Sequence, residues 1–316
     1  MHRSFTSISL ALAALVLLPA SRVAAQLVPG SGVKITNVGD DFEDESWEYV
    51  FNSPKSSEEQ DKHVRMPGGR SKNGRLYESA KRGQPDIIRR VPTPPNGLPG
   101  SLGSLFLASR HTGIPGRPSR KMQQDDLIIN VQGVGGNIPV WQGPSCVVRV
   151  YLPPFEEWEN RTGTSFGLRA EVMSTPTGGG FLKKEKSEQY WPGFFIWFRS
   201  ETDRQHAEDG AHLIVRAGPS GHDFQGPEIT ELGWWTLGMS FTPDGRVHFY
   251  ASPGVDDLTQ ADHISSQYPY GFRCQVFQTM FFNIANGDDG RTWSTGWVID
   301  DPELYLARPP HRSARR

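Results

Sequence analysis

The stretch WWTLGMSF, residues 234–241, is followed by TPDG at 242–245 and by RVHFYAS at 246–252. Apolar and polar residues largely alternate in the two outer runs, as they do in strands that bury one face. The four residues between the runs include the proline and glycine that favour a tight turn. The stretch therefore predicts two antiparallel strands joined as a hairpin.

Strand-like runs of the same kind follow one another from residue 127 onward, with almost no helical periodicity. They are LIINVQ, CVVRVYL, SFGLRAEVM, GFFIWFRS, AHLIVRA, RCQVFQTMFFNI and WVIDDPELYLA, and GSLFLAS at 103–109 precedes them. Ten or more short strands joined by turns are typical of a two-sheet sandwich or a barrel. We expect an all-β fold, a two-sheet antiparallel β-sandwich.

The composition agrees with this fold class. The 316 residues include 34 Gly and 25 Pro, and aromatic residues make up 11% of the chain although hydrophobic residues are only 36%. Helical bundles and coiled coils are rich in Ala, Leu, Glu and Lys instead, and disordered chains have few aromatic residues. These classes are therefore disfavoured.

The first 25 residues have the pattern of a secretory signal peptide. Arg3 precedes an apolar run at 8–18, and the small residues at 23–25 suit signal peptidase. The apolar run is too short to span a bilayer, so we expect no membrane span after cleavage near Ala25. The expected location is secreted, periplasmic or in the cell envelope.

We expect a single domain over 26–307 and a disordered basic tail over 308–316. Within the domain, residues 52–125 form a long Pro/Gly-rich segment with 14 basic and 6 acidic residues. This segment could wrap the sandwich as a solvated or self-complementing surface, or it could meet a polyanion such as an acidic glycan. The sequence has neither a zinc-binding pattern nor a basic helix with interleaved aromatic residues, the features that would indicate nucleic-acid binding.

The two cysteines, Cys146 and Cys274, both fall in strand-like runs. In an exported protein they could form one disulfide, and two buried free thiols are the alternative. Two cysteines without clustered histidines do not predict a structural metal site.

The hairpin at 234–252 and the closing GWVIDDPELYL at 296–306 resemble the strands of laminin-G and concanavalin A-like jelly rolls. DDFED at 40–44, followed by Trp47, is similar to the entry of exported bacterial proteins of this type. The resemblance implies a sandwich with a concave sheet face, which in relatives often binds or cuts carbohydrate. Fold does not fix function, and neither the Glu-x-Asp-x-x-Glu pattern of a retaining glucanase nor the full alginate-lyase strand motifs are present.

Alternation within the strand-like runs predicts which side chains leave the core, provided that these strands share one sheet. The outward side chains are Arg149, Tyr151, Arg169, Glu171, Trp197, Arg199, His212, Arg216, Gln275 and Asn283. An aromatic ring among Arg, Gln and Asn suits a sugar, and several Arg favour an acidic one. The alternative is a polar sheet face stabilised by cross-strand ion pairs. Carbohydrate binding is therefore our first hypothesis, with a non-enzymatic envelope or adhesion protein as another.

An enzyme on the same fold is the second hypothesis. A polysaccharide lyase needs a base, for which His212 and Tyr151 are candidates, and cations to hold the substrate carboxylate. A glycosidase needs two carboxylates, and Glu171 is the only acid on the predicted face. No cofactor is required by either scheme.

The turn NGDDG at 286–290 is crowded with oxygen atoms. Asp288 and Asp289 are weak candidates for Ca²⁺ ligands, although Asn-Gly and Asp-Gly are ordinary turn sequences. The turn interpretation is favoured, because the spacing of an EF-hand is missing.

Overall fold

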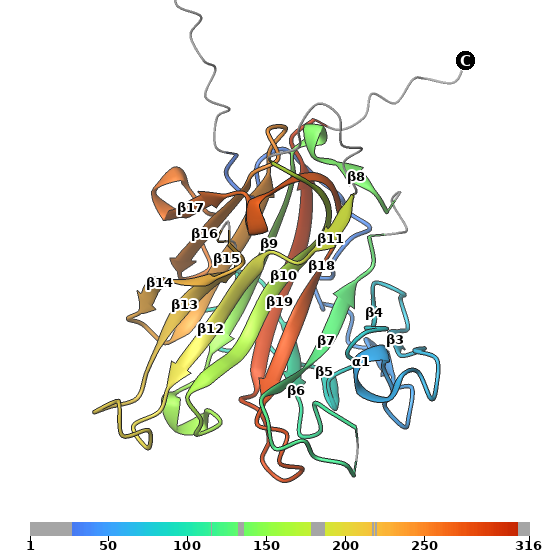
Figure 1. The fold of residues 1–316 in the computed structure, drawn as a ribbon, viewed down its shortest axis with the longest axis vertical. Coiled ribbons are helices and arrows are strands. Elements are labelled where there is room, and N and C mark those ends of the chain that lie inside the picture. The colour runs from blue at the N-terminus through green and yellow to red at the C-terminus, as the bar shows by residue number, and fades with distance from the viewer. Residues whose placement is uncertain are drawn as a thin grey trace, which may run out of the picture.

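The computed structural model of this chain describes residues 27–114, 116–131, 136–177, 187–216, 218 and 220–308. The expected signal peptide and nearly all of the expected basic tail lie outside these residues. Two antiparallel β-sheets pack face to face, which confirms the predicted sandwich (Figure 1). The hairpin predicted first is present, and Met239 pairs with Phe249 in it.

The first sheet, here called sheet A, has the order β17-β16-β15-β9-β19-β6-β5, with β1 paired to β19. Its strands are β1 (Val33–Lys34), β5 (Ile87–Pro92), β6 (Gly103–Ala108), β9 (Pro144–Leu152), β15 (Gly233–Phe241), β16 (Val247–Pro253), β17 (His263–Gln267) and β19 (Trp297–Leu306).

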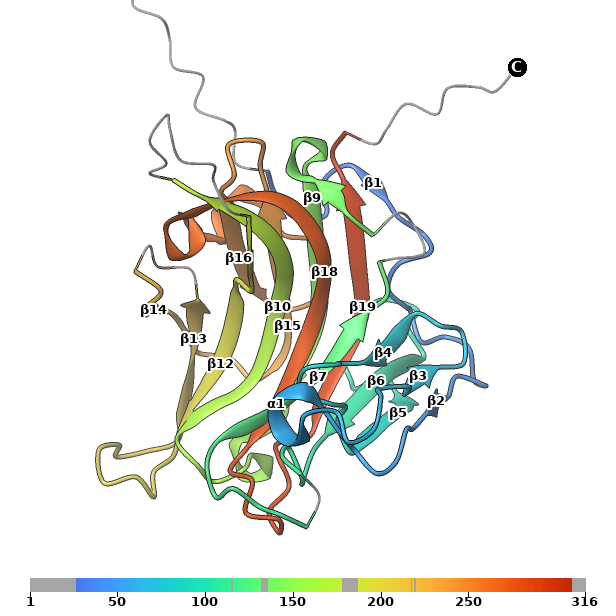
Figure 2. The ribbon, with the colours of Figure 1, turned by 45° about the vertical axis from the view of Figure 1, so that its right-hand side comes forward.

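The second sheet, sheet B, has the order β14-β13-β12-β10-β18-β7-β4-β3-β2, with β11 on β10 and β8 on β18. Its strands are β2 (Tyr49–Val50), β3 (Arg70–Ser71), β4 (Leu76–Glu78), β7 (Gln123–Ile129), β8 (Ile138–Pro139), β10 (Gly163–Pro176), β11 (Glu188–Tyr190), β12 (Gly193–Arg199), β13 (Gly210–Arg216), β14 (Asp223–Ile229) and β18 (Phe272–Asn286). The long strands β10 and β18 are strongly bent (Figure 2). Helical turns are short: α1 (Glu58–Asp61) and 3₁₀ turns at 140–142, 155–157, 260–262 and 269–271.

Aromatic side chains from both sheets meet in the core. Phe166 of sheet B lies 5.1 Å, ring centre to ring centre, from Trp297 of sheet A, and Phe194 lies 5.1 Å from Phe249. All four are fully buried. Burying such rings is the main stabilisation of a sandwich and fixes which face of each strand turns outward.

The basic segment 52–125 is more than a wrapping loop. It contains β3 and β4 of sheet B and β5 and β6 of sheet A, and it ends in β7. The strand expected at 103–109 is confirmed as β6. The segment therefore contributes to both sheets, while residues 52–62 and 79–86 stay outside these strands.

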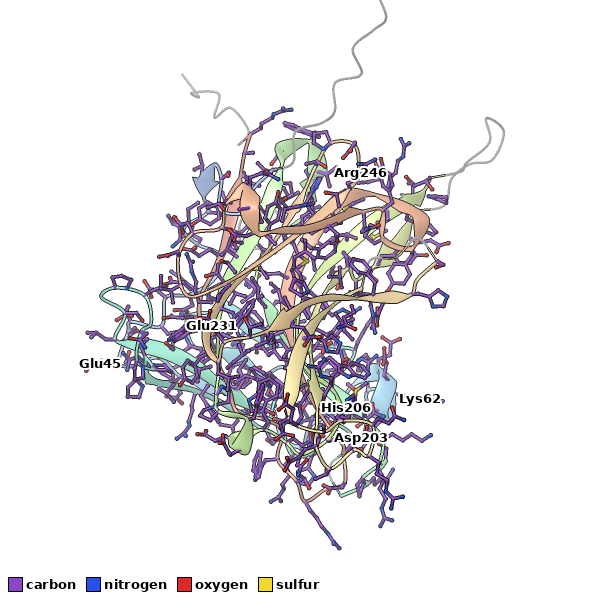
Figure 3. All side chains as sticks on the ribbon, turned by 90° about the vertical axis from the view of Figure 1, so that its left-hand side faces the viewer. Glu45, Lys62, Asp203, His206, Glu231 and Arg246 are labelled. Atoms are coloured by element: carbon purple, nitrogen blue, oxygen red, sulfur yellow. The ribbon has the colours of Figure 1, made fainter. Side chains whose placement is uncertain are left out.

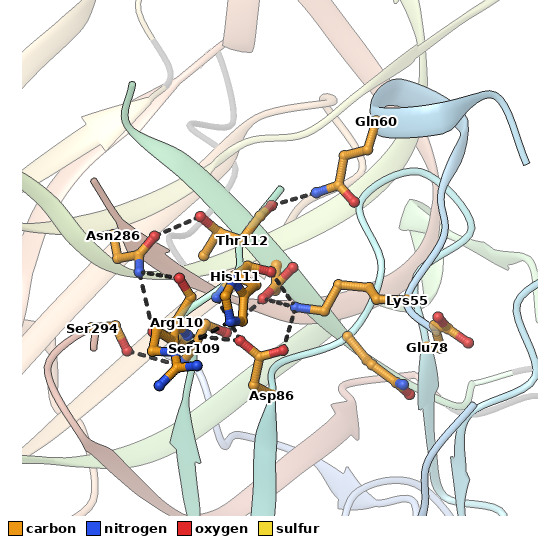
Figure 4. Close-up of polar contacts among 12 residues, drawn as sticks. Lys55, Gln60, Glu78, Asp86, Ser109, Arg110, His111, Thr112, Asn286 and Ser294 are labelled. Carbon is orange, nitrogen blue, oxygen red and sulfur yellow. Dashed lines mark hydrogen bonds and ion pairs between the residues drawn. The ribbon is translucent and has the colours of Figure 1, made fainter. Parts of the chain in front are cut away.

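A buried ion cluster ties this segment to the sandwich (Figure 4). The Nζ atom of Lys55 lies 2.6 Å from Asp125 Oδ2 and 3.0 Å from Asp86 Oδ1, and it donates to the carbonyl of His111 at 2.6 Å. Ser109 Oγ donates to the same oxygen of Asp125. The cluster fixes Lys55, which precedes α1 in the chain, against β7 of sheet B.

The two cysteines are free and buried. Cys146 belongs to β9 in sheet A, whereas Cys274 belongs to β18 in sheet B. In this structure they form no disulfide. Burial raises the pKa of Cys146 to about 12, which makes its thiol unreactive at neutral pH.

Candidate functional site

The outer face of sheet B, the face turned away from the core, can be mapped from strand register. Arg169 on β10 pairs with Phe281 on β18 and with Gly193 on β12, and Gly193 pairs with Arg216 on β13. One row below, Asn283 on β18 lies between Gly167 and Asp126. Sequence alternation thus correctly placed the outward residues of β10, β12 and β13 on one face.

Two expected members of this face lie elsewhere. Arg149 and Tyr151 belong to β9, which is in sheet A, so our assumption of one sheet is wrong for them. Arg149 is ion-paired with Glu303 at 2.9 Å, and the ring of Tyr151 lies 5.5 Å from that of Trp234. Alternation along a strand cannot say to which of two sheets the strand belongs. Tyr151 is therefore not a base for a reaction on sheet B.

Arg169 is at the centre of the outer face. Its guanidinium donates from Nε and Nη2 to the carbonyl of Trp191, at 3.2 and 2.8 Å. It also lies 5.5 Å from the ring centres of both Phe195 and Phe281. A Cβ on Gly193 would come within 2.6 Å of the Arg169 Cγ, so only glycine lets this side chain lie flat there. Burial lowers the pKa of Arg169 to about 10, so it remains a cation at neutral pH.

Aromatic and basic residues outside β10 complete the surroundings of Arg169. Trp191 precedes β12, and the Nζ atom of Lys81 lies 3.9 Å from the centre of its indole ring. Arg82 is held by an ion pair with Glu59 of α1, at 2.8 Å. Both cations come from the segment 52–125. The sequence shows that this segment is basic, but it does not show that the segment lies beside the outer face of sheet B.

These residues line two adjacent cavities, of about 140 Å³ and 260 Å³, that we call the central groove. The two cavities share Lys81, Asp126, Trp191 and Phe281. Tyr77 and Glu171 lie at one end, and Arg216 lies at the other. A third cavity, of about 290 Å³, shares Glu59 and Arg82 with the smaller of these two and has Asp288 in its lining. The segment 52–125 therefore forms one wall of the groove and does not fill it.

Asp126 is one of the groove residues that strand alternation did not predict. We expected the strand to begin at Leu127, whereas β7 begins at Gln123 and its alternation continues back through Asp126. Both Asn283 Nδ2, at 2.5 Å, and Gln124 Nε2, at 3.0 Å, donate to Asp126 Oδ1. Burial raises its pKa to about 6, against the opposing charges of Arg82 and Arg169.

Glu171 faces the same groove, as expected. Its two oxygens accept hydrogen bonds from the Gln189 amide and, at 3.5 Å, from the indole N–H of Trp191. Tyr77 lies across the groove in β4, and burial together with the charge of Glu171 raises its pKa to about 12.

The remaining predicted residues of sheet B lie away from the central groove. Trp197, Arg199 and His212 line a separate cavity of about 480 Å³ beside the 205–208 loop, which includes His206 (Figure 3). His212 is buried, and this burial lowers its pKa. Gln275 is exposed near the start of β18, where its amide donates to Thr175.

Two of the expected arginines are already paired with acids. Arg199 donates to both oxygens of Glu228 at 2.9 and 2.7 Å, and Arg216 makes a similar pair with Asp223. In the part of the chain that the structure describes, Arg169 makes no ion pair. Of the predicted arginines on sheet B, it is the one free to bind an anion.

The carboxylates of the NGDDG turn accept hydrogen bonds from backbone N–H groups of the chain. Asp288 Oδ2 accepts from the backbone N–H of Ser119, and Asp289 Oδ1 accepts from those of Arg291 and Thr292, all at 2.7 Å. Among the described residues, no three His, Cys, Asp or Glu side chains are grouped to hold a metal ion. These bonds support the turn interpretation of Asp288 and Asp289.

Another aromatic cavity lies at sheet A. Tyr151 and Trp234 line a space of about 390 Å³ together with Pro95 and Asn96. This cavity has no basic residue in its lining. It is therefore the main competitor of the central groove as a sugar site, but without a group that would select an acidic sugar.

Comparisons with known proteins concern the fold. No protein-family model matches the chain, and a search of curated proteins finds no match. Similar solved structures include a carbohydrate esterase from the Shiga toxin-encoding bacteriophage phi24B, with a TM-score of 0.43 and 9% identity over 74% of this chain and 90% of that one. A beta-glucanase catalytic domain from Podospora anserina has a TM-score of 0.41 and 10% identity over 73% and 84% of the two chains.

An alginate lyase from Pseudomonas aeruginosa is also similar, with a TM-score of 0.39 and 8% identity over 70% of this chain and 86% of that one. These likenesses concern the arrangement of strands, and no residue role in this chain follows from them. The described residues contain no helix that is both long and apolar enough to cross a bilayer.

Proposed function

We propose that this protein is exported and binds an acidic polysaccharide in the central groove of sheet B. Arg169 carries the proposal, because it is a buried cation that makes no ion pair with an acid among the described residues, although the charge of Asp126 acts on it. Two of the five N–H groups of a guanidinium are occupied by the Trp191 carbonyl here, which leaves donors for a carboxylate.

The walls of the groove suit the other parts of a sugar. The indole of Trp191 and the ring of Phe281 offer apolar faces for stacking, and Lys81 adds a positive charge above the indole. Gln189 lines the larger cavity, and because its amide nitrogen donates to Glu171, its amide oxygen is the atom offered to hydroxyl groups. Ligand sites commonly combine such apolar walls with a few fixed polar groups.

The length of the groove favours a polymer over a single sugar. The third cavity adjoins the central groove at Glu59 and Arg82, and Arg82 supplies a further cation there. We therefore expect affinity to rise with the number of sugar units until the groove is filled.

A binding screen of the chain from Gln26 tests the proposal. The screen compares uronic-acid polymers, sulfated polymers and neutral polymers, and absorbance near 235 nm is followed to detect unsaturated ends. We expect binding to the uronic-acid polymers and weak or no binding to the neutral ones. Failure to bind any acidic polymer would overturn the proposal and favour the non-enzymatic envelope protein with a protein partner.

A further inference from the structure

A carboxyl group lies inside the groove to which we assign an anionic ligand. Asp126 lines both cavities of the central groove, and 6% of its surface is exposed. Arg169, which carries the proposed binding of a sugar carboxylate, lines the smaller of these cavities. A carboxylate bound to Arg169 therefore shares this cavity with a second carboxyl group. Two carboxylates in one partly enclosed space repel each other unless one of them holds a proton.

The hydrogen bonds of Asp126 leave one of its oxygen atoms for this proton. Both amide donors, from Gln124 and Asn283, bond to Oδ1. Among the described residues no side chain bonds to Oδ2. Oδ2 can therefore take up a proton without the loss of either hydrogen bond, and the resulting O–H group is a donor for a ligand in the groove.

Charged groups from several elements surround Asp126. The charged and titratable residues that line the two cavities come from α1, β4, the 79–86 loop, β10 and β13, and they are Glu58, Glu59, Tyr77, Lys81, Arg82, Arg169, Glu171 and Arg216. No histidine is among the described residues that line these cavities. Burial raises the pKa of Asp126 to about 6, although the charges of Arg82 and Arg169 act in the opposite direction. Asp126 therefore changes its charge in mildly acidic to neutral solution.

We propose that the central groove binds an acidic sugar together with one proton, which Asp126 takes up from solvent, so that binding becomes tighter as the solution is acidified. This inference rests on the binding proposed above. In the bound state Arg169 holds the sugar carboxylate, which then faces a neutral Asp126 instead of a like charge. When the sugar is released, the proton returns to solvent.

The direction of the effect follows from the linkage between the two binding events. A bound carboxylate is a nearby like charge, so it raises the pKa of Asp126 further, and the bound state keeps its proton to a higher pH than the free state. Affinity is therefore greatest below the pKa of the free protein and is lost as pH rises through the two values. A rise of about one unit in this pKa on binding corresponds to roughly tenfold weaker binding at pH 8 than at pH 5.

The experiment measures the dissociation constant of the uronic-acid polymer that binds best in the screen. It covers pH 5 to pH 8 at constant ionic strength, a range in which the carboxylates of the polymer stay ionised. Three proteins are compared: the chain from Gln26, Asp126→Asn and the control His63→Gln. His63 is the control because its ring contacts the carbonyl of the lining residue Ala80, at 2.6 Å.

Two further measurements accompany the titrations. Thermal unfolding shows whether each variant is folded. Calorimetry in two buffers of different ionisation enthalpy counts the protons that the unchanged chain takes up on binding, so this result does not depend on any variant.

We expect the unchanged chain and His63→Gln to bind roughly tenfold more weakly at pH 8 than at pH 5, with uptake of roughly half a proton near pH 6.5 by the unchanged chain. Asp126→Asn should keep the tight binding of pH 5 throughout the range. Equal affinity of the unchanged chain at pH 5 and pH 8, binding without proton uptake, a pH dependence that persists in folded Asp126→Asn, or one that disappears in His63→Gln would overturn the role of Asp126 but not the binding. Absence of binding at every pH would overturn the binding proposal itself.

Discussion

Asp125 and Asp126 are consecutive residues of β7, and their side chains lie on opposite faces of sheet B. Asp125 is fully buried against Lys55, at 2.6 Å, whereas Asp126 lines the central groove beside Arg169. The pleat of a strand requires this alternation. One carboxylate therefore anchors the segment 52–125, and its neighbour is available for a ligand that this segment helps to enclose.

Replacing Arg169 should weaken the binding of acidic polymers specifically. In Arg169→Gln the substrate carboxylate loses a charged donor, and we expect a 10- to 100-fold rise in Kd, about 1.5–3 kcal/mol. Titration calorimetry at constant salt measures this change. The control is Arg246→Gln, since Arg246 is exposed at the opposite end of the molecule from His206 (Figure 3). Equal losses in the two variants would mean that only net charge matters.

Two tryptophans distinguish the central groove from the neighbouring cavity on the same face. Trp191 lines the central groove, and Trp197 lines the cavity beside His212. We expect Trp191→Ala to weaken binding by roughly tenfold, because a stacking surface is lost, and Trp197→Ala to have little effect. The opposite order of the two effects would move the site to the Trp197 cavity.

Lys55→Met should destabilise the protein strongly. The substitution leaves Asp125 buried without its cation, and breaking such a pair costs about 3–5 kcal/mol. Lys72→Met is the matched control, because Lys72 makes an exposed pair with Glu48 that contributes less than about 1 kcal/mol. Denaturant unfolding of both variants measures the difference. Similar free energies of unfolding would show that the buried cluster does not hold the segment.

The free energy of unfolding should depend on pH through Asp300. Burial raises the pKa of this carboxyl from 3.8 to about 7, so the folded state binds a proton that the unfolded state releases. The free energy of unfolding is therefore highest with respect to Asp300 below pH 4, where its carboxyl is protonated in both states. It falls as pH rises from 4 to 7, because the folded state then has to ionise a buried carboxyl. Asp300→Asn cannot titrate, and we expect its stability to improve relative to the unchanged protein between pH 4 and pH 8.

Comparing the two proteins at each pH cancels the titrating groups that do not interact with Asp300, including His248, whose pKa burial lowers to about 4; the neighbouring Asp301, whose charge helps to raise the pKa of Asp300, is the exception. A constant difference in the free energy of unfolding across this range would contradict the pKa of Asp300. The measurement is denaturant unfolding in buffers of equal ionic strength.

The sequence predicted the sandwich because buried aromatic and aliphatic residues alternate along most strands. Arg169, Glu171 and Asn283 could be placed on one face for the same reason. The position of β9 could not be predicted, since pairing with β15 and β19 is a long-range choice that alternation does not encode. The misplacement of Tyr151 follows from this.

The contribution of residues 52–125 to the groove could not be predicted from the sequence either. Lys81 and Arg82 follow no periodic pattern, and they are held in place by contacts with α1, a backbone hydrogen bond from Glu59 to the Lys81 carbonyl and the ion pair of Arg82 with Glu59. Leu127 and Ile129 face the core, and extending this alternation back by one residue predicts that Asp126 faces outward. Two adjacent aspartates before an apolar run were the available signal.

A crystal structure with a bound uronic-acid tetrasaccharide tests the central claim most directly. We predict that a sugar carboxylate lies within hydrogen-bond distance of Arg169 and that a sugar ring stacks on Trp191. A tetrasaccharide bound instead between Tyr151 and Trp234 of sheet A, with the central groove empty, would contradict the account.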